Sequence, residues 1–175
     1  LGFLSILESV SNTVKSGGFL RIVNRDVSPK LIEKLFWDKV NSMLSDVKQN
    51  NNSKQSRQVH ISAEIADARK LPTQRKFDSI ITSPPYPNRH DYTRIYSLEM
   101  IFDFVSTNQE LKKIRYETIR SHVEARKKYE AAKYERPAIL DKLVNKIEKN
   151  GTNNPQIIDM LNGYFEDMYL CLSEM

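Results

Sequence analysis

The sequence predicts an α/β fold, and three observations support this. Apolar residues recur at helical spacing near both ends of the chain, short runs with the length and composition of strands lie between them, and the two kinds of segment alternate. A chain of 175 residues has room for one domain with a sizeable core, or for one domain plus an appendage. Hydrophobic residues at 39% and charged residues at 28% are typical of a soluble globular protein.

The first part of the chain is expected to form a helix, a strand and a second helix. A helical repeat of apolar residues from Phe3 to Val14 runs to Gly17-Gly18, where a glycine stop is expected. Phe19–Val23 has the length and composition of a short strand. Pro29 then opens a helical pattern that continues through Leu44. Residues 49–58 are polar and lack periodicity, which indicates a surface loop or a mobile linker.

The middle of the chain is expected to add two strands and a helix. Val59–Ile61 is a short candidate strand, and Phe77–Ile81 is the clearest strand pattern in the chain. The latter runs into Thr82–Pro87, whose three prolines do not allow a helix or a central strand to continue. Apolar spacing from Tyr96 to Val105 then predicts a buried helix.

The last part of the chain is predicted to be helical. Thr107 and Glu110 have the spacing of a capping box, which marks the start of a long charged helix that Pro137 should interrupt. Asn150-Gly151 ends the next helix, and Asn154-Pro155 begins a final helix with a continuous apolar stripe. The expected organisation is a partial core at 1–107, a basic helical insertion at 108–150, and a helix returning to the core at 151–175.

Positive charge is concentrated in one segment. Between Glu110 and Lys149 there are twelve Lys and Arg against seven Asp and Glu, whereas the remainder has equal numbers of each. All of the formal charge of +5 therefore lies in this segment, and a polyanion-binding surface needs such a local excess. A solvated face of mixed charge is the alternative.

Composition also limits the class of protein. The single Cys171 excludes an internal disulfide and any cysteine-based zinc cluster, so nothing in the chain requires an oxidising compartment. No stretch approaches 18 uninterrupted apolar residues, and the start of the chain lacks a basic region followed by an apolar one. A cytoplasmic protein without a membrane partner is expected. The chain begins without Met and stops inside an apolar-periodic run, as an excerpt of a longer protein would.

The loop after the clearest strand has a distinct chemistry. In open α/β sheets, ligand sites lie beyond the carboxyl ends of strands, and Thr82–Pro87 follows one such end. Pro84 and Pro85 fix two successive φ angles and remove two amide donors, which leaves a stiff rim of acceptors. The Ser83 side chain and the Pro84 carbonyl can both accept hydrogen bonds from one amino group, beside the flat ring of Tyr86. This arrangement suits a planar ring that carries an amine; a proline turn that merely ends a strand is the alternative.

Thr82-Ser83-Pro84-Pro85-Tyr86, preceded by the strand pattern Phe77–Ile81, resembles the catalytic motif of S-adenosylmethionine-dependent DNA methyltransferases that modify exocyclic amines. Segments 87–92, 98–100 and 163–168 are similar to a subgroup of these enzymes, so the resemblance covers about 67–175. It implies a partial Rossmann-like methyltransferase sheet with a long charged helical insertion, S-adenosylmethionine as cofactor, and DNA as substrate. A serine before Pro-Pro-Tyr favours cytosine N4 over adenine N6. RNA as substrate and a cognate restriction endonuclease as partner remain open.

The resemblance also implies roles for individual residues. The catalytic loop would be Ser83, Pro84, Pro85 and Tyr86, with Asp67 and Thr82 near the cofactor. A capping or salt-bridging role is the alternative for Asp67. Candidate DNA contacts are Arg89, His90, Arg115, Arg120, Arg126, Lys127 and Lys128.

The sequence pattern lacks a set of metal ligands and a glycine-rich cofactor loop. His60 and His122 lack partners at ligand spacing, so no metal site is expected. The glycine-rich cofactor loop of the family is also absent, because the adjacent glycines Gly17-Gly18 precede a strand pattern rather than follow one. We expect that loop to lie outside this segment; a catalytically inactive DNA-binding or interaction fragment is the alternative.

Overall fold

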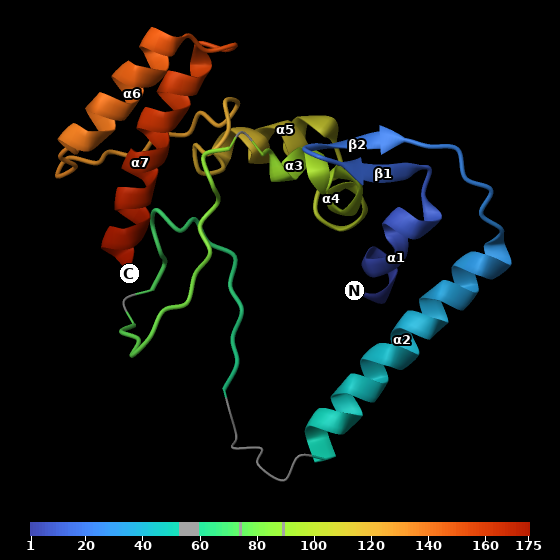
Figure 1. Ribbon diagram of the computed structural model, residues 1–175. Helices are drawn as coiled ribbons and strands as arrows, with labels where there is room; N and C mark the ends of the chain where they lie inside the picture. Colours follow the sequence, from blue (N-terminus) through green and yellow to red (C-terminus); the bar gives the residue numbers. More distant parts are fainter. Residues whose placement is uncertain (53–59, 74, 89) are drawn as a thin grey trace. The chain divides into compact units, whose positions relative to one another are not determined.

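The computed structural model describes residues 1–52, 60–73, 75–88 and 90–175 and divides into two compact units (Figure 1). The first unit comprises Leu1–Ala63 and Tyr92–Ser106, and the second comprises Glu64–Asp91 and Thr107–Met175. The expected organisation into 1–107, 108–150 and 151–175 stays a prediction. Residues 64–91, however, which include the proline-rich loop, belong with the C-terminal helices rather than with the N-terminal segment.

The first unit begins with a helix and a β-hairpin. Helix α1 (Gly2–Val10) is followed by strands β1 (Thr13–Ser16) and β2 (Phe19–Ile22), which pair antiparallel. The predicted strand at 19–23 is thus confirmed, but the helix does not continue to Gly17-Gly18. Ser11 is already extended, and the β-branched pair Thr13-Val14 forms a strand instead. Gly17, with φ of 60°, makes the hairpin turn.

Helix α2 (Pro29–Asn52) starts at the predicted proline and is longer than predicted. It continues into the polar run expected from residue 49, and the rest of that run, 53–58, lies outside the described residues together with Val59 of the candidate strand. Helix α1 packs against α2, where a Cβ added at Gly2 would lie 3.2 Å from a methyl group of Val40.

Two short helices, α3 (Tyr92–Ile95) and α4 (Ser97–Asp103), complete the first unit where one helix was predicted. The Phe102 ring packs edge-on against Phe3 with ring centroids 5.4 Å apart. Lys15 of β1 reaches Glu99 of α4, with 2.6 Å between Nζ and Oε1. The prediction that this helix is buried is wrong for α4, which has no buried residue; its main contacts are with the four-residue helix α3 and with α1.

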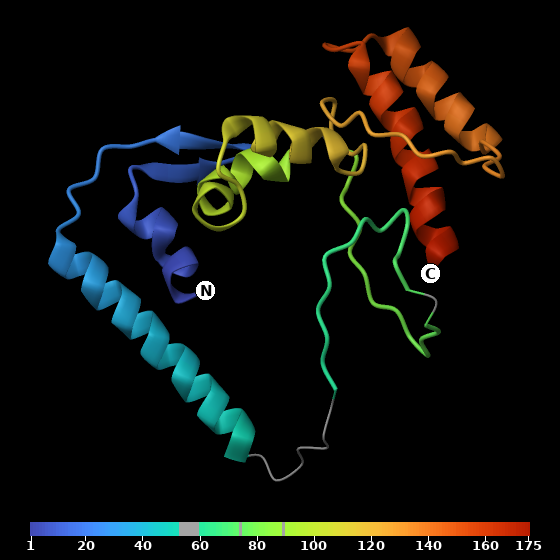
Figure 2. The same cartoon turned by 180° about the vertical axis from the view of Figure 1, so that it is seen from behind.

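The second unit contains α5 (Asn108–Glu117), α6 (Ala138–Asn150) and α7 (Gln156–Glu174). The Thr107 side chain accepts a hydrogen bond from the Glu110 amide, so the predicted helix start is confirmed. Gly151, with φ of 76°, ends α6 as expected. Helices α6 and α7 lie side by side in both views (Figures 1 and 2). The buried apolar residues of this unit are Leu111, Leu140, Val144, Met160, Tyr164 and Cys171.

The long charged helix predicted up to Pro137 is interrupted much earlier. Helix α5 ends at Glu117, Thr118 is extended, and residues 118–137 are not helical. The carbonyl oxygens of Glu117 and Thr118 accept hydrogen bonds from the Arg69 guanidinium. Side-chain donors thus satisfy carbonyl groups that a continuing helix would have paired with its own amides. A tertiary contact therefore ends this helix, and the local sequence pattern does not show it.

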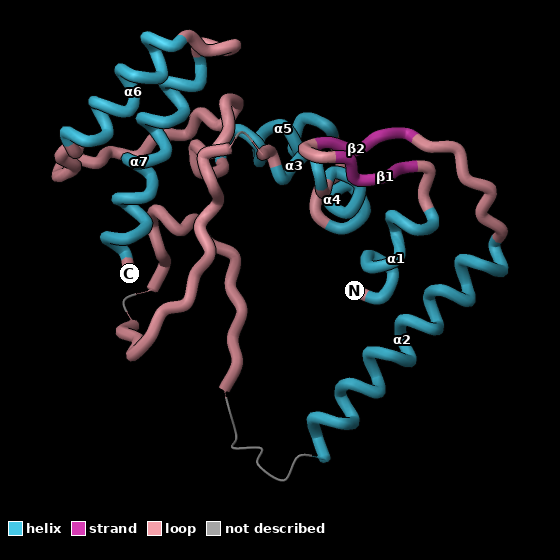
Figure 3. The backbone as a smooth tube through the Cα atoms, in the orientation of Figure 1, coloured by secondary structure: helices cyan, strands magenta, loops and turns pink. Residues whose placement is uncertain are grey.

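The clearest predicted strand is not formed. Residues 60–91 run as loop wherever they are described, apart from an isolated antiparallel bridge between Asp67 and Lys70 (Figure 3). Phe77–Ile81 is exposed, with Ile81 at 97%. A strand is stable only when neighbouring strands pair with it, and within the described ranges the only sheet is the β1–β2 hairpin. The structure confirms a mixture of helices and strands, and the Rossmann-like sheet stays a prediction. The described helices include none that is both long and apolar enough to cross a membrane.

Candidate active site and its buried charge network

The proline-rich loop exposes the side chains that sequence analysis assigned to chemistry. Thr82, Ser83 and Tyr86 are exposed, with Tyr86 at 68%, whereas Pro84 and Pro85 are half-buried. The Asn88 amide donates to the Tyr86 carbonyl at 2.8 Å and closes a tight turn behind the ring. The loop therefore presents a hydroxyl and an aromatic ring to solvent on a backbone that the prolines stiffen.

Tyr86 lies within electrostatic range of helix α7. Burial is the main cause that raises the pKa of Tyr164, and the Cys171 thiol and the Tyr86 phenol add to it. Tyr164 is only 9% exposed, so its ring belongs to the core of the second unit. The loop that carries Tyr86 is thus next to a helix whose residues 163–168 are part of the same family resemblance.

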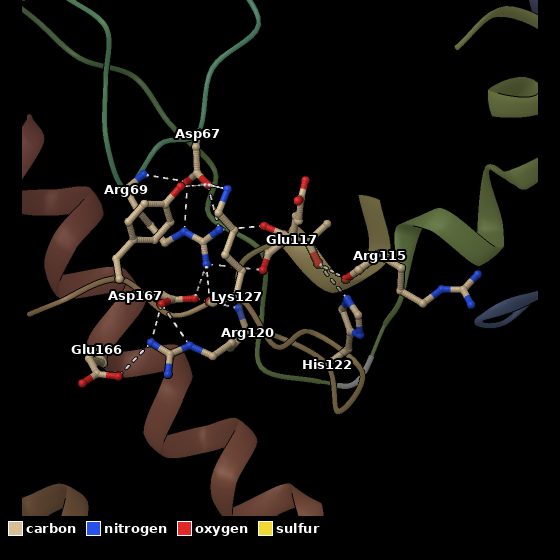
Figure 4. Close-up of polar contacts among 11 residues, drawn as sticks. Asp67, Arg69, Arg115, Glu117, Arg120, His122, Lys127, Glu166 and Asp167 are labelled. Carbon is tan, nitrogen blue, oxygen red and sulfur yellow. Dashed lines mark hydrogen bonds and ion pairs between the residues drawn. The ribbon is translucent and has the colours of Figure 1, made fainter. Parts of the chain in front are cut away.

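Asp67 is held by two neighbours (Figure 4). Its Oδ1 accepts from the amide and Nε of Arg69, and its Oδ2 accepts from Arg69 Nη2 at 2.8 Å and from the Tyr129 hydroxyl at 3.1 Å. These hydrogen bonds, that from the Arg69 side chain foremost, lower the pKa of the carboxyl to about 2. Asp67 is therefore ionised and has the salt-bridging environment that was the alternative to a cofactor contact.

Arg69 connects Asp67 to a fully buried carboxylate on α7. Its Nη1 donates to Asp167 Oδ2 at 2.9 Å, and neither side chain has exposed area. On its other side, Asp167 accepts from Arg120 through the backbone amide at 2.9 Å and through Nε at 3.0 Å. Arg120 Nη2 also donates to Glu166 at 2.8 Å. Two arginines thus share one buried carboxylate, which gives the charge pairing that burial requires.

The same arginine holds the chain segment after α5. Arg69 Nη2 donates to the Glu117 carbonyl at 2.7 Å, and Nη1 donates to the Lys127 carbonyl at 3.2 Å. The guanidinium also lies over the Tyr129 ring, 4.8 Å from its centroid. Arg69 therefore joins three parts of the second unit: its own loop, the segment at 117–129, and helix α7.

Gly163 provides the space that Arg120 occupies. A Cβ at this position would lie 2.6 Å from Arg120 Cδ and 2.8 Å from Nε, both closer than side-chain carbons approach one another. The arginine stem crosses α7 directly over this glycine and reaches Asp167 one turn later. Gly163 is needed here because a larger residue would collide with Arg120. Its backbone is helical, a conformation that any residue can adopt.

The candidate DNA contacts fall into two groups. Arg120 and Arg115 were expected to be accessible to DNA, and the structure shows that both are paired with carboxylates instead. Arg120 is 5% exposed within the network, and Arg115 Nε pairs with Asp91 at 2.8 Å and with Glu124 at 3.4 Å. Their guanidinium groups are occupied by carboxylates. Arg126 and Lys128 are exposed, Lys127 and His90 are half-exposed, and Arg89 lies outside the described residues.

Two of the accessible cations rest on aromatic rings. The Arg126 guanidinium lies 4.4 Å from the centroid of Tyr116, and Lys127 Nζ lies 5.1 Å from that of Tyr129. A hydrogen bond with Tyr129 is the main cause that raises the pKa of Lys127. Both side chains keep part of their surface open to a ligand.

Among the described residues, no group of three or more His, Cys, Asp and Glu side chains is arranged to hold a metal ion. His122 is 4% exposed, and its Nε2 lies 2.9 Å from the Thr118 hydroxyl. Its environment is that of a core histidine.

Sequence analysis did not assign roles to Arg69 and Asp167, which form the centre of the network. One signal for Asp167 was available. It shares the buried face of the last helix with Met160, Tyr164 and Cys171, at spacings of seven, three and four residues. A carboxylate on an apolar helix face requires a buried cation as partner. Which arginine supplies it depends on the tertiary structure.

Comparisons with known proteins show that the chain is similar to type II methyltransferases. No protein-family model and no solved structure matches it. Its relatives include the type II methyltransferase M.AvaI of Nostoc sp. (strain PCC 7120 / SAG 25.82 / UTEX 2576) and of Anabaena variabilis, each 34% identical over 109 residues, or 56% of this chain and 22% of the relative. The chain thus spans less than half the length of these relatives. Over 98% of its own length it is also similar, at 28% identity, to 43% of the type II methyltransferase M.BsoBI of Geobacillus stearothermophilus.

Proposed function

We propose that this chain carries the catalytic loop of a site-specific DNA methyltransferase, which moves a methyl group from S-adenosylmethionine to the exocyclic amine of a flipped base. The observation that carries the proposal is the exposure of Ser83 and Tyr86 on the proline-rich loop, in a chain similar over 98% of its length to a type II methyltransferase. Because the chain spans 43% of that relative, the activity is proposed for the protein that contains this chain.

The rim suits an amine that is attached to an aromatic ring. Such a nitrogen donates its lone pair into the ring and is a poor nucleophile while it stays planar. When the Ser83 hydroxyl and the Pro84 carbonyl accept its two hydrogens, they draw these hydrogens out of the ring plane and return the lone pair to the nitrogen. Because the prolines fix the backbone, the acceptors are positioned before the base arrives, and this lowers the entropy cost of the reactive geometry.

Tyr86 is proposed to stack on the flipped base. A base inside a duplex cannot reach an acceptor rim, so it must leave the helix, at a cost of a few kcal/mol. The Tyr86 ring is 68% exposed and free to offer one face to that base. Stacking of a base on an aromatic side chain contributes about 1–3 kcal/mol, which offsets part of this cost.

The residues assigned to the cofactor do not by themselves form a site for it. A carboxylate has about four acceptor positions, and Arg69 and Tyr129 together donate four hydrogen bonds to Asp67. An adenine amino group would have to displace one of these donors. Thr82 is exposed. Most of the cofactor contacts must therefore come from residues other than these two.

Cytosine N4 is the proposed target atom, and the basis is the serine at position 83. A hydroxyl is a neutral acceptor, whereas Asp or Asn at this place usually accompanies adenine N6 in the family that the loop resembles. Both rings carry an amine of similar geometry, so adenine N6 is the second candidate within the same class. The accessible cations Arg126, Lys127 and Lys128 are proposed to contact phosphates without reading sequence.

A transfer assay tests the proposal against its main competitor, an inactive DNA-binding fragment. Tritium from labelled S-adenosylmethionine should appear in unmodified DNA when the protein that contains this chain is added. Ser83→Ala should lower the rate, whereas Ser173→Ala on exposed α7 surface should not. If the protein binds DNA but transfers no label to any DNA, the enzyme assignment is wrong. Label in RNA and not in DNA would change the substrate class.

A further inference from the structure

The last turn of α5 holds two segments to which the proposed function gives different tasks. One is the end of the proline-rich loop at Asp91, five residues after Tyr86. The other is the cationic segment, residues 126–128, whose side chains are proposed to contact phosphates. All of these residues belong to the second unit. The residues of α5 that hold them are Arg115 and Tyr116.

Arg115 holds the end of the loop by an ion pair that is largely withdrawn from water. Its Nε lies 2.8 Å from Asp91 Oδ2, and the two side chains are 17% and 7% exposed. Such a pair is strong because solvent ions screen it less than they screen a surface pair. The Arg115 side chain leaves α5 on the side away from Arg69 (Figure 4). This ion pair is therefore separate from the network around Arg69.

Two local hydrogen bonds connect Asp91 to the aromatic ring of the rim. The Asn88 amide donates to the Tyr86 carbonyl at 2.8 Å, and the His90 amide donates to Asn88 Oδ1 at 3.1 Å. Each bond fixes a turn of the backbone between Tyr86 and Asp91. The position of Asp91 therefore limits where the Tyr86 ring can lie.

The same turn of α5 holds the cationic segment through its backbone. The Tyr116 carbonyl accepts hydrogen bonds from the Arg126 and Lys127 amides, each at 2.9 Å. The Arg126 guanidinium also lies 4.4 Å from the centroid of the Tyr116 ring. Glu124, just before this segment, is a second carboxylate partner of Arg115, with 3.4 Å between Oε2 and Nε. Arg115 thus pairs with one carboxylate beside each of the two segments.

We propose that Arg115 is a positioning residue for methyl transfer, which fixes the end of the proline-rich loop relative to the cationic segment. The inference rests on the proposed function, because it takes the two segments to hold one DNA substrate. A strand whose phosphates contact residues 126–128 then presents its flipped base in a fixed position relative to Ser83 and Tyr86. Misplacement of reacting groups by about 1 Å can slow a reaction about 100-fold. Arg115 therefore acts on the rate of transfer and not as a phosphate contact.

Kinetics of the protein that contains this chain test the proposal. Arg115→Gln removes the cation from both carboxylates, and Lys113→Gln removes an exposed cation two residues earlier on the same helix. Arg115→Gln should lower kcat at saturating DNA about 10- to 100-fold, while DNA affinity and its salt dependence stay as in the wild type. Lys113→Gln should leave kcat unchanged. Weaker DNA binding with a salt slope smaller by about 1, at unchanged kcat, would identify Arg115 as a phosphate contact and overturn the proposal.

Two further variants separate positioning from a general loss of folding. Arg115→Lys keeps a cation near Asp91, so it should recover most of the kcat that Arg115→Gln loses. Asp91→Asn should slow transfer by itself, but its effect should not add to that of Arg115→Gln, because the two residues form one contact. Additive effects in the double variant, or equal losses of kcat in Arg115→Lys and Arg115→Gln, would overturn the positioning role.

Amide hydrogen exchange gives a measurement that needs no methyl transfer. In the same protein, Arg115→Gln should speed exchange several-fold at the Asn88 and His90 amides, whose hydrogen bonds fix the turns, and leave α7 unchanged. If exchange rises there and the wild type transfers no methyl group, the contact at Arg115 stands and the proposed function fails. If the wild type transfers methyl groups and Arg115→Gln does so at the same rate, the proposed function stands and the positioning role fails. Unchanged exchange would also overturn the inference.

Discussion

The Arg69 guanidinium donates to the Asp167 carboxylate at 2.9 Å, and both side chains are completely buried. Arg69 lies two residues after Asp67 in the loop, and Asp167 lies in the middle of the last helix, 98 residues further along the chain. This pair, with Arg120 on the other side of Asp167, connects the segment that precedes the proline-rich loop to α7. A buried charge network therefore holds Arg69 against the last helix.

Asp167→Asn should be strongly destabilising. It leaves Arg69 and Arg120 buried without a carboxylate, and removing one partner of a buried ion pair costs about 3–5 kcal/mol. The free energy of unfolding in urea measures the loss. Glu166→Gln is the control on the neighbouring residue: its side chain is 35% exposed, so the loss should stay below about 1 kcal/mol. Equal losses of unfolding free energy in the two variants would show that the buried ion pair stabilises the fold no more than the exposed one.

Gly163→Ala tests the close approach of Arg120 to α7. The added methyl group would lie 2.6 Å from Arg120 Cδ, and this side chain cannot move freely because Asp167 and Glu166 hold its guanidinium. We expect a loss of about 1–3 kcal/mol, the usual cost of overpacking, although alanine is the better helix former. A variant that is more stable than the wild type would mean that helix propensity outweighs the clash.

Acid should weaken the second unit through Asp67. Its pKa is lowered in the folded chain to about 2 from an ordinary 3.8, mainly by the hydrogen bond from Arg69. A lowered carboxyl pKa adds stability that is present above about pH 4 and is lost as the pH falls towards 2. Urea unfolding across this range should show a steeper loss for the wild type than for Asp67→Asn. Parallel losses would contradict the salt-bridging role of Asp67.

Cys171 reports on the integrity of the helical core. It is 2% exposed, and burial raises the pKa of its thiol, so at pH 8 the native chain should react very slowly with a chromogenic thiol reagent. Urea should expose it and make the reaction fast. The chain has a single cysteine, so the signal has one source. Rapid reaction without denaturant would show that α7 is not packed as described.

The 175-residue chain should bind S-adenosylmethionine weakly. Both oxygens of Asp67 already accept two hydrogen bonds each, and the glycine-rich loop of the family that it resembles is absent from the sequence. Calorimetric titration should show no tight one-to-one binding, whereas DNA binding should persist and weaken with salt. Tight stoichiometric binding of S-adenosylmethionine by this chain would show that other residues of the chain form the cofactor site.

Local signals predicted several element ends correctly. Pro29 and Thr107 start helices, and Gly151 ends one, because proline, a capping hydroxyl and a left-handed glycine act through nearby backbone atoms. Val14 was placed in a helix because its apolar spacing matched, although it lies in a strand. Spacing alone does not separate a helix from a helix followed by a hairpin.

The failures elsewhere have tertiary causes. Phe77–Ile81 has a strand's composition, but a strand also needs neighbours to pair with, which composition does not report. Helix α5 ends at Glu117 because Arg69, 48 residues earlier, takes its last carbonyl groups. For the candidate site, the sequence predicted a rim at Ser83 and Tyr86, and its role stays a prediction. It missed Arg69 and Asp167 because their pairing exists only in the folded chain.

Nucleoside analysis of treated DNA tests the central claim most directly. DNA lacking modification is incubated with S-adenosylmethionine and the protein that contains this chain, as wild type and as Tyr86→Ala, then digested and analysed by mass spectrometry. We predict N4-methylcytosine with the wild type and about 5- to 150-fold slower formation with Tyr86→Ala, the loss that removal of a 1–3 kcal/mol stacking contact gives. Tyr86 is 68% exposed, so the variant should fold normally. No methylated nucleoside, or equal rates for the two proteins, would contradict the account.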